Sequence, residues 1–161
     1  MGLSEDWTPA GSGAAKPEAP AGAPWDPASF QVAPAEGKVR FHDLGLPDPL
    51  MRALADLNFA YCTPIQGLSL PISLAGKDVA GRAQTGTGKT AAFLLAILNR
   101  FLQNPPEARR PAGTPRALIL APTRELVAQI DKDAAALSRY CPIRTLAVYG
   151  GMEFRTQQRK L

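Results

Sequence analysis

Histidine and cysteine are scarce in this chain of 161 residues, which has one histidine and two cysteines. Cys62 and Cys141 lie far apart and form no C-x-x-C pair, which excludes a disulfide framework and a cysteine-based zinc site. The single histidine, His42, excludes a histidine metal cluster, and no motif supports a Ser-His-Asp triad built on it. Because free thiols fit a reducing compartment, we expect a cytoplasmic protein.

Long apolar runs are also missing. No stretch reaches the roughly eighteen apolar residues of a membrane span, and the N-terminal residues lack the basic opening and apolar stretch of a secretory signal. Charge is unevenly placed, because residues 41–161 hold 15 basic and 9 acidic side chains, a net of +6 within a whole-chain charge of +4. The net positive charge of residues 41–161 favours a polyanionic partner, which could be either a nucleic acid or the phosphates of a nucleotide.

The first 37 residues differ in composition from the rest of the chain. They contain six prolines and five glycines and few large apolar side chains. Proline excludes helix interiors, glycine raises the entropy cost of ordering, and little apolar surface is present to offset that cost. We therefore expect residues 1–38 to be a disordered tail rich in Pro, Ala and Gly, with Trp7 and Trp25 solvated.

Helical segments are predicted where proline or threonine precedes an apolar stripe. One begins near Pro47 and another at Thr63, where threonine is the N-cap and Pro71 is expected to kink or end the helix. Two further helices are predicted over residues 88–102 and through about Tyr140. A last one is expected at the end of the chain, over residues 153–161.

Strand-like segments alternate with these helices. Residues 78–81 form a weak strand pattern, residues 117–121 are a fully apolar run bounded by prolines, and residues 144–149 form a third strand. The alternation predicts an α/β fold with a parallel sheet flanked by helices. Ligands of such sheets bind at the carboxyl ends of the strands, which is where the motifs below fall.

A glycine-rich loop stands between the weak strand and the third helix. Its backbone amides and the following helix N-terminus suit a polyphosphate, with Lys89 reaching the β- and γ-phosphates and the Thr90 hydroxyl binding Mg²⁺. The residues of this predicted phosphate-binding loop, or P-loop, are Ala83, Gln84, Thr85, Gly86, Thr87, Gly88, Lys89 and Thr90.

Two alternatives compete with the P-loop interpretation. The strict pattern begins with glycine where this chain has Ala83, and residues 86–91 also match the dinucleotide fingerprint G-x-G-x-x-A. That fingerprint requires an acidic residue closing a strand roughly twenty positions on, where residues 104–107 are predicted to be a loop. A flexible connector would leave Lys89 and Thr90 at the helix start unexplained. We therefore prefer the P-loop.

The wording Ala-Gln-Thr-Gly-Thr-Gly-Lys-Thr, alanine included, resembles the first motif of the DEAD-box ATP-dependent RNA helicases. Residues 58–66 resemble the Q motif of the same family, with Phe41 standing 17 positions before it. The resemblance implies that Gln66 reads the adenine edge and that Phe41 stacks on the adenine ring. Two positions depart from the usual Q motif, which has glycine at the position of Asn58 and proline at the position of Cys62.

Two further motifs follow in the family's order. Residues 122–126 resemble motif Ia, and the glycine pair at 150–151 resembles the GG motif. Alone, the first is equally a helix start with a capping threonine and the second a turn. After a P-loop, the resemblance implies contacts to the RNA sugar–phosphate backbone. The implied RNA-binding residues are Pro122, Thr123, Arg124, Glu125, Gly150 and Gly151.

The resemblance implies a division of the chain into a tail (1–38), a Q-motif region (39–67) and the N-terminal part of a first RecA-like ATP-binding domain (68–161). It implies ATP and Mg²⁺ as cofactors, Lys89 and Thr90 as catalytic residues, RNA bound without sequence preference, and protein partners within a larger RNA-processing complex. No membrane association is implied.

The Asp-Glu-Ala-Asp motif that gives the family its name does not occur in the chain. Asp131 and Asp133 are no substitute, because they lie within a predicted helix. We therefore expect an incomplete RecA-like domain, truncated before this motif, with little or no ATPase activity of its own. Two alternatives stay open: a non-catalytic nucleotide- or RNA-binding module, and a related superfamily 2 helicase that acts on DNA.

Overall fold

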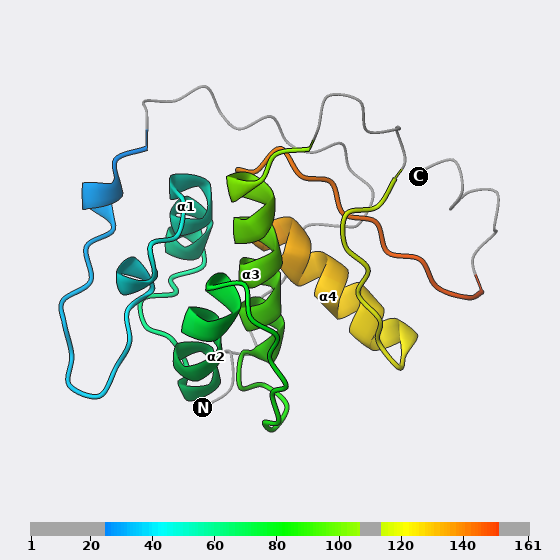
Figure 1. Cartoon of the computed structure of the whole chain (residues 1–161), viewed down its shortest axis with the longest axis horizontal. Coiled ribbons are helices and arrows are strands. Elements are labelled where there is room, and N and C mark those ends of the chain that lie inside the picture. Colours follow the sequence, from blue (N-terminus) through cyan, green and yellow to red (C-terminus); the bar gives the residue numbers. More distant parts are fainter. Residues whose placement is uncertain (1–24, 107–113, 152–161) are drawn as a thin grey trace.

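The computed structural model describes residues 25–106 and 114–151 (Figure 1). Helices dominate the described chain. In order, they are η1 (Pro27–Ser29), η2 (Phe41–Leu44), α1 (Asp48–Asp56), α2 (Pro64–Leu74), α3 (Lys89–Gln103) and α4 (Arg124–Leu137), where η denotes a 3-10 helix. The helix predicted over residues 153–161 and tail residues 1–24 lie outside the described residues. None of the described helices is long and apolar enough to cross a membrane.

The four predicted α-helices within the described residues are confirmed, with one correction to α2. Thr63 is its N-cap and Pro64 its first residue, as predicted. Pro71, however, lies inside α2 and does not end it, since the Ala75 amide still donates to the Pro71 carbonyl at 3.3 Å. Proline removes one helical hydrogen bond, and the packing of α2 against α3 holds the helix across that gap.

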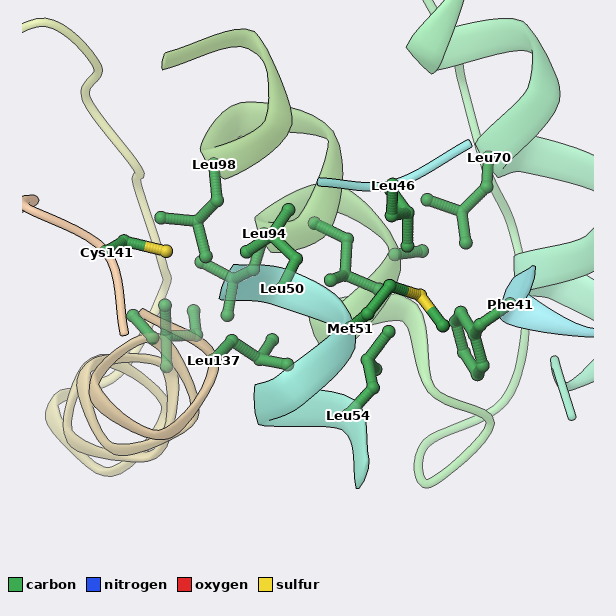
Figure 2. Packing of buried hydrophobic residues seen from close by; sticks show 14 residues of the cluster. Phe41, Leu46, Leu50, Met51, Leu54, Leu70, Leu94, Leu98, Leu137 and Cys141 are labelled. Carbon is green, nitrogen blue, oxygen red and sulfur yellow. The ribbon is translucent and has the colours of Figure 1, made fainter. Parts of the chain in front are cut away.

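The hydrophobic core lies between α1, α2, α3 and α4, and α2 contributes Leu70 (Figure 2). Leu50 and Leu54 recur at helical spacing on α1 and are fully buried. α3 contributes Leu94 and Leu98, and α4 contributes Leu137. Because α3 contacts each of the other three α-helices, it is the element around which the core is built.

The three segments predicted as strands do not form a sheet within the described residues. Residues 78–81, 117–121 and 144–149 run without strand pairing, and the backbone bridges in the described chain are two isolated ones elsewhere. A parallel strand is stabilised by hydrogen bonds from a neighbour, and no described backbone bond joins residues 117–121 to residues 144–149. The apolar run is accordingly exposed, with Leu118 at 79% and Leu120 at 84%.

Residues 25–38, which we expected to be disordered, follow a defined path beside α1 (Figure 1). The Asp26 carboxylate caps η1 by accepting a hydrogen bond from the Ala28 amide at 2.9 Å. Trp25 and Phe30 pack against the core. Composition alone underestimated the order of this segment, because two aromatic side chains and a local cap offset the entropy cost that its glycines add.

Candidate functional site

The P-loop is followed directly by α3, as the sequence predicted. Gly88 is the N-cap residue, with a left-handed φ of +88°, and Lys89 and Thr90 form the first turn of the helix. The first α3 backbone bond runs from the Ala92 amide to the Gly88 carbonyl at 3.1 Å. The earlier amides therefore have no acceptor within the helix, which leaves donors and the positive end of the helix dipole beside the loop.

Lys89 is held by its own loop in this chain. Its Nζ donates to the carbonyl oxygens of Ala83 and Gln84, and the Thr87 hydroxyl donates to the same Gln84 carbonyl at 2.7 Å. The ammonium group thus sits within the turn of the loop, where a phosphate oxygen would compete with carbonyl oxygens for it. Lys89 would have to exchange these carbonyl partners for phosphate oxygens to contribute to an anion site at the start of α3.

The Q motif and the P-loop are joined by side-chain hydrogen bonds. The Thr63 hydroxyl donates to the Thr87 carbonyl at 2.7 Å, and the Gln66 Nε2 donates to the Gly88 carbonyl at 3.1 Å. Gln66 Oε1 accepts from the Thr63 amide at 2.9 Å. Sequence reasoning identified Thr63 only as a helix cap and missed its link to the P-loop, although its place within the Q motif was the available signal.

Both polar groups of Gln66 are therefore used within the protein, and its side chain is 3% exposed. Phe41 is fully buried, in contact distance of the Phe59 ring with centroids 6.5 Å apart. An adenine ring cannot stack on Phe41 in this conformation. Its adenine contact stays a prediction, and it requires the ring to leave the core.

Two ionisable groups beside the Q motif have shifted pKa values. Burial, helped by the nearby Asp43 carboxylate, raises the pKa of the Cys62 thiol to about 11. The Arg40 guanidinium, which hydrogen-bonds both Asp43 oxygens, lowers the pKa of that carboxyl. The Cys62 thiol is therefore protonated at neutral pH, and the Arg40–Asp43 pair is an ion pair.

The predicted RNA-binding residues come together around Arg124. A Cβ added to Gly151 would lie 2.6 Å from the Arg124 guanidinium, and one added to Gly150 would lie 3.6 Å from it. Only glycine allows the guanidinium to pack so closely on this turn. Thr123 caps α4 by accepting from the Leu126 amide at 3.2 Å. All six predicted residues are exposed: Pro122, Thr123, Arg124, Glu125, Gly150 and Gly151.

Among the described residues, no three His, Cys, Asp or Glu side chains gather into a metal site. Asp131 and Asp133 lie inside α4, as predicted, and so do not stand at the end of a strand. Thr90, whose hydroxyl we predicted to bind Mg²⁺, lies in the first turn of α3.

Comparison with known proteins shows the family of this chain. The family model described as DEAD/DEAH box helicase matches residues 63–161. This match spans the second half of the Q motif, the P-loop, motif Ia and the glycine pair. The chain therefore belongs to the DEAD/DEAH box helicase family, whose members similar to this chain are enzymes named as ATP-dependent RNA helicases.

Individual relatives resemble most of this chain but are much longer. ATP-dependent RNA helicase RhlB of Pseudomonas aeruginosa is 57% identical over 130 residues, which is 81% of this chain and 33% of that protein. RhlB of Idiomarina loihiensis is 51% identical over 77% of this chain and 29% of its own length. The chain thus spans about a third of the curated relatives that it matches.

A solved structure shares the fold. The RNA helicase Prp28 from Chaetomium thermophilum, bound to ADP, superposes with a TM-score of 0.66 and 38% identity. The match covers 74% of this chain and 28% of the Prp28 chain. The described helices therefore have the arrangement found in a DEAD-box helicase domain.

Proposed function

We propose that this chain is the nucleotide-binding and RNA-backbone-binding part of an ATP-dependent RNA helicase. The observation that carries the proposal is the direct contact between the Q motif and the P-loop. Thr63 and Gln66 donate hydrogen bonds to the P-loop carbonyls of Thr87 and Gly88. A motif that recognises adenine and a loop that binds phosphate have to be adjacent to hold one nucleotide. Membership of the DEAD/DEAH box family supports the same activity.

In this proposal Lys89 exchanges its two loop carbonyl partners for phosphate oxygens of ATP, and the free amides of the first α3 turn donate to the same group. Gln66 exchanges its bond to Gly88 for the adenine edge, because an amide both donates and accepts. Phe41 stacks on adenine only after its ring has left the core.

The Thr90 hydroxyl would bind Mg²⁺. Magnesium in nucleotide sites keeps several waters and takes few protein ligands, so a single hydroxyl beside Lys89 fits the ion. When bound, Mg²⁺ neutralises charge on the β- and γ-phosphates. Because the sequence holds no Asp-Glu-Ala-Asp motif to position water, we propose that the chain itself hydrolyses little ATP.

RNA is the proposed polymer partner. Arg124, packed on Gly150 and Gly151, can form a bidentate pair with a backbone phosphate, and the glycines allow a strand to approach closely. A DNA-acting helicase is distinguished by comparing single-stranded RNA and DNA at matched salt, since phosphate contacts alone bind both. We also propose a cytoplasmic location, since Cys62 and Cys141 are not joined in a disulfide, and protein partners in RNA processing.

We further propose that residues 78–81, 117–121 and 144–149 form the parallel sheet of a RecA-like domain in a longer protein. The apolar, exposed run at 117–121 supports this, because it has the composition of a buried strand and lacks a paired neighbour among the described residues.

The test of the proposed nucleotide site is Lys89→Ala, measured by titration with a fluorescent ADP analogue in the presence of Mg²⁺. Losing a charged contact to phosphate should weaken binding by about tenfold or more. Lys77→Ala is the matched control, because it removes the same charge from an exposed position outside the loop and should bind as wild type. Equal affinities for all three chains would contradict the P-loop assignment.

A further inference from the structure

The segment at residues 25–40, which we name the N-terminal arm, contacts the loop that carries the Q motif. Residues 58–63 form this Q-motif loop. Arg40 and Tyr61 form an isolated antiparallel bridge, and the Cys62 amide donates to the Val39 carbonyl at 2.8 Å. The arm therefore pairs with the residues immediately before Thr63.

Tyr61 adds a longer-range contact between the same two segments. Its hydroxyl donates to the Ala33 carbonyl at 2.8 Å, and the Lys38 ammonium lies 5.0 Å from the centre of its ring. Tyr61 thus spans the hairpin of the arm, in which Ala35 and Lys38 are bridged.

The arm is fastened at its other end by two residues, Arg40 and His42. Arg40 donates to the Val32 carbonyl at 3.0 Å, and His42 Nε2 hydrogen-bonds the Phe30 carbonyl. Four carbonyl groups of the arm thereby accept hydrogen bonds from residues 40–62. They belong to Phe30, Val32, Ala33 and Val39.

The contacts continue from the Q-motif loop to the P-loop. Gly67, one residue after Gln66, packs against Val39 so closely that an added Cβ would lie 3.2 Å from its Cγ2. Thr63 and Gln66 then bond to the P-loop carbonyls. A continuous chain of backbone and side-chain contacts thus runs from the arm to the start of α3.

We propose that the N-terminal arm is a positioning element for nucleotide binding, and that Tyr61 is its main side-chain anchor on the Q-motif loop. By donating to Ala33, Tyr61 holds the loop so that Thr63 keeps its bond to the P-loop and Gln66 stays beside it. Tyr61 itself touches no nucleotide. The inference rests on the proposed function, since it assigns the arm a role at the same site.

The decisive variant is Tyr61→Phe, which removes one hydroxyl and keeps the ring. Tyr140→Phe is the matched control, because the Tyr140 hydroxyl also donates a single hydrogen bond, to Asp56 at 2.6 Å, between α1 and the end of α4. Both variants of the full chain are compared in affinity for a fluorescent ADP analogue and in thermal midpoint.

A second readout follows arm docking without any nucleotide. Cys62 is half-buried and its amide is hydrogen-bonded to Val39 of the arm, so its labelling by iodoacetamide, located by peptide mass, should be slow while the arm is docked. Tyr61→Phe should label Cys62 several-fold faster and bind the ADP analogue about two- to tenfold more weakly. Tyr140→Phe should match wild type in both measurements.

The outcomes separate this inference from the proposed function. If Tyr61→Phe labels and binds as wild type does, the arm inference is overturned. Faster labelling with unchanged affinity also overturns it, because the arm would then be anchored without positioning the site. If wild type binds no nucleotide, the proposed function fails and the role in nucleotide binding fails with it. The labelling rate then still decides whether Tyr61 fixes the Q-motif loop.

Discussion

Gly88 must be glycine for two separate reasons. Its φ of +88° lies in the left-handed region that side chains other than glycine rarely adopt. An added Cβ would also lie 2.4 Å from the Gln66 Nε2, within the hydrogen bond that joins the Q motif to the P-loop. Gly86 shares the first constraint, with φ at +76°, but has open space where a Cβ would be.

The pair Gly88→Ala and Gly86→Ala separates these two effects. Each variant should lose about 1 kcal/mol of unfolding free energy from backbone strain. Gly88→Ala should lose roughly 1–2 kcal/mol more, because the Gln66 amide is displaced from its buried partners. Urea denaturation followed by circular dichroism measures both losses. Equal losses would mean that Gln66 moves aside without cost.

The sequence predicted which residues belong to the site, but not their hydrogen-bond partners or their burial. The spacing of Gln66 and the P-loop could be read directly, because both are contiguous motifs. That Gln66 bonds Gly88, and that Phe41 is buried against Phe59, depends on how η2, α2 and α3 pack. A pattern of residue types contains no such distances.

At the scale of elements, α4 carries two roles at its first turn. Thr123 caps the helix through the Leu126 amide, and Arg124 packs on the glycine pair. The sequence left two interpretations of residues 122–126 open, a helix start with a capping threonine and a motif that contacts RNA. The two interpretations are compatible. The cap fixes the direction of the helix, and the next residue presents its guanidinium at the surface.

Thr123→Ala should remove the cap and lower the unfolding free energy by about 1 kcal/mol, within the range measured for N-cap threonines. Thr123→Ser keeps an oxygen in the same place and should recover most of that loss. Chemical denaturation of the three chains measures the difference. A serine variant as unstable as the alanine variant would show that the Thr123 methyl group, rather than its hydroxyl, stabilises α4.

Helices could be predicted better than strands, for a physical reason. The hydrogen bonds of α3 lie within residues 89–103, so its apolar stripe and start are local properties. The bonds of a parallel strand belong to its neighbours. Residues 117–121 have the composition of a buried strand, yet no described backbone bond pairs them with residues 144–149, and Leu118 and Leu120 are exposed.

At the scale of the whole molecule, buried and exposed leucines divide the chain into a packed helical body and an uncovered apolar run. Leu118 and Leu120 are 79% and 84% exposed, whereas Leu94 is 2% exposed in the core. Exposed apolar residues that stand together favour association between molecules.

Replacing both Leu118 and Leu120 by lysine should therefore reduce self-association without lowering the thermal midpoint, because little apolar area is removed from water there. Leu94→Lys should unfold the chain, because it buries a charge in the core. Sedimentation velocity measures association and circular dichroism measures melting. A large drop in the midpoint of the double lysine variant would mean that this run is packed in solution.

The sequence by itself determined the family and the four described α-helices, because each depends on residues that are contiguous or periodic in the chain. It did not determine that residues 25–38 are ordered, since their stability comes from contacts with α1 and the Q-motif loop. Only the tertiary structure decided which motifs touch. Thr63 reaches Thr87 and Arg124 reaches Gly151 because packing of the helices brings distant segments together.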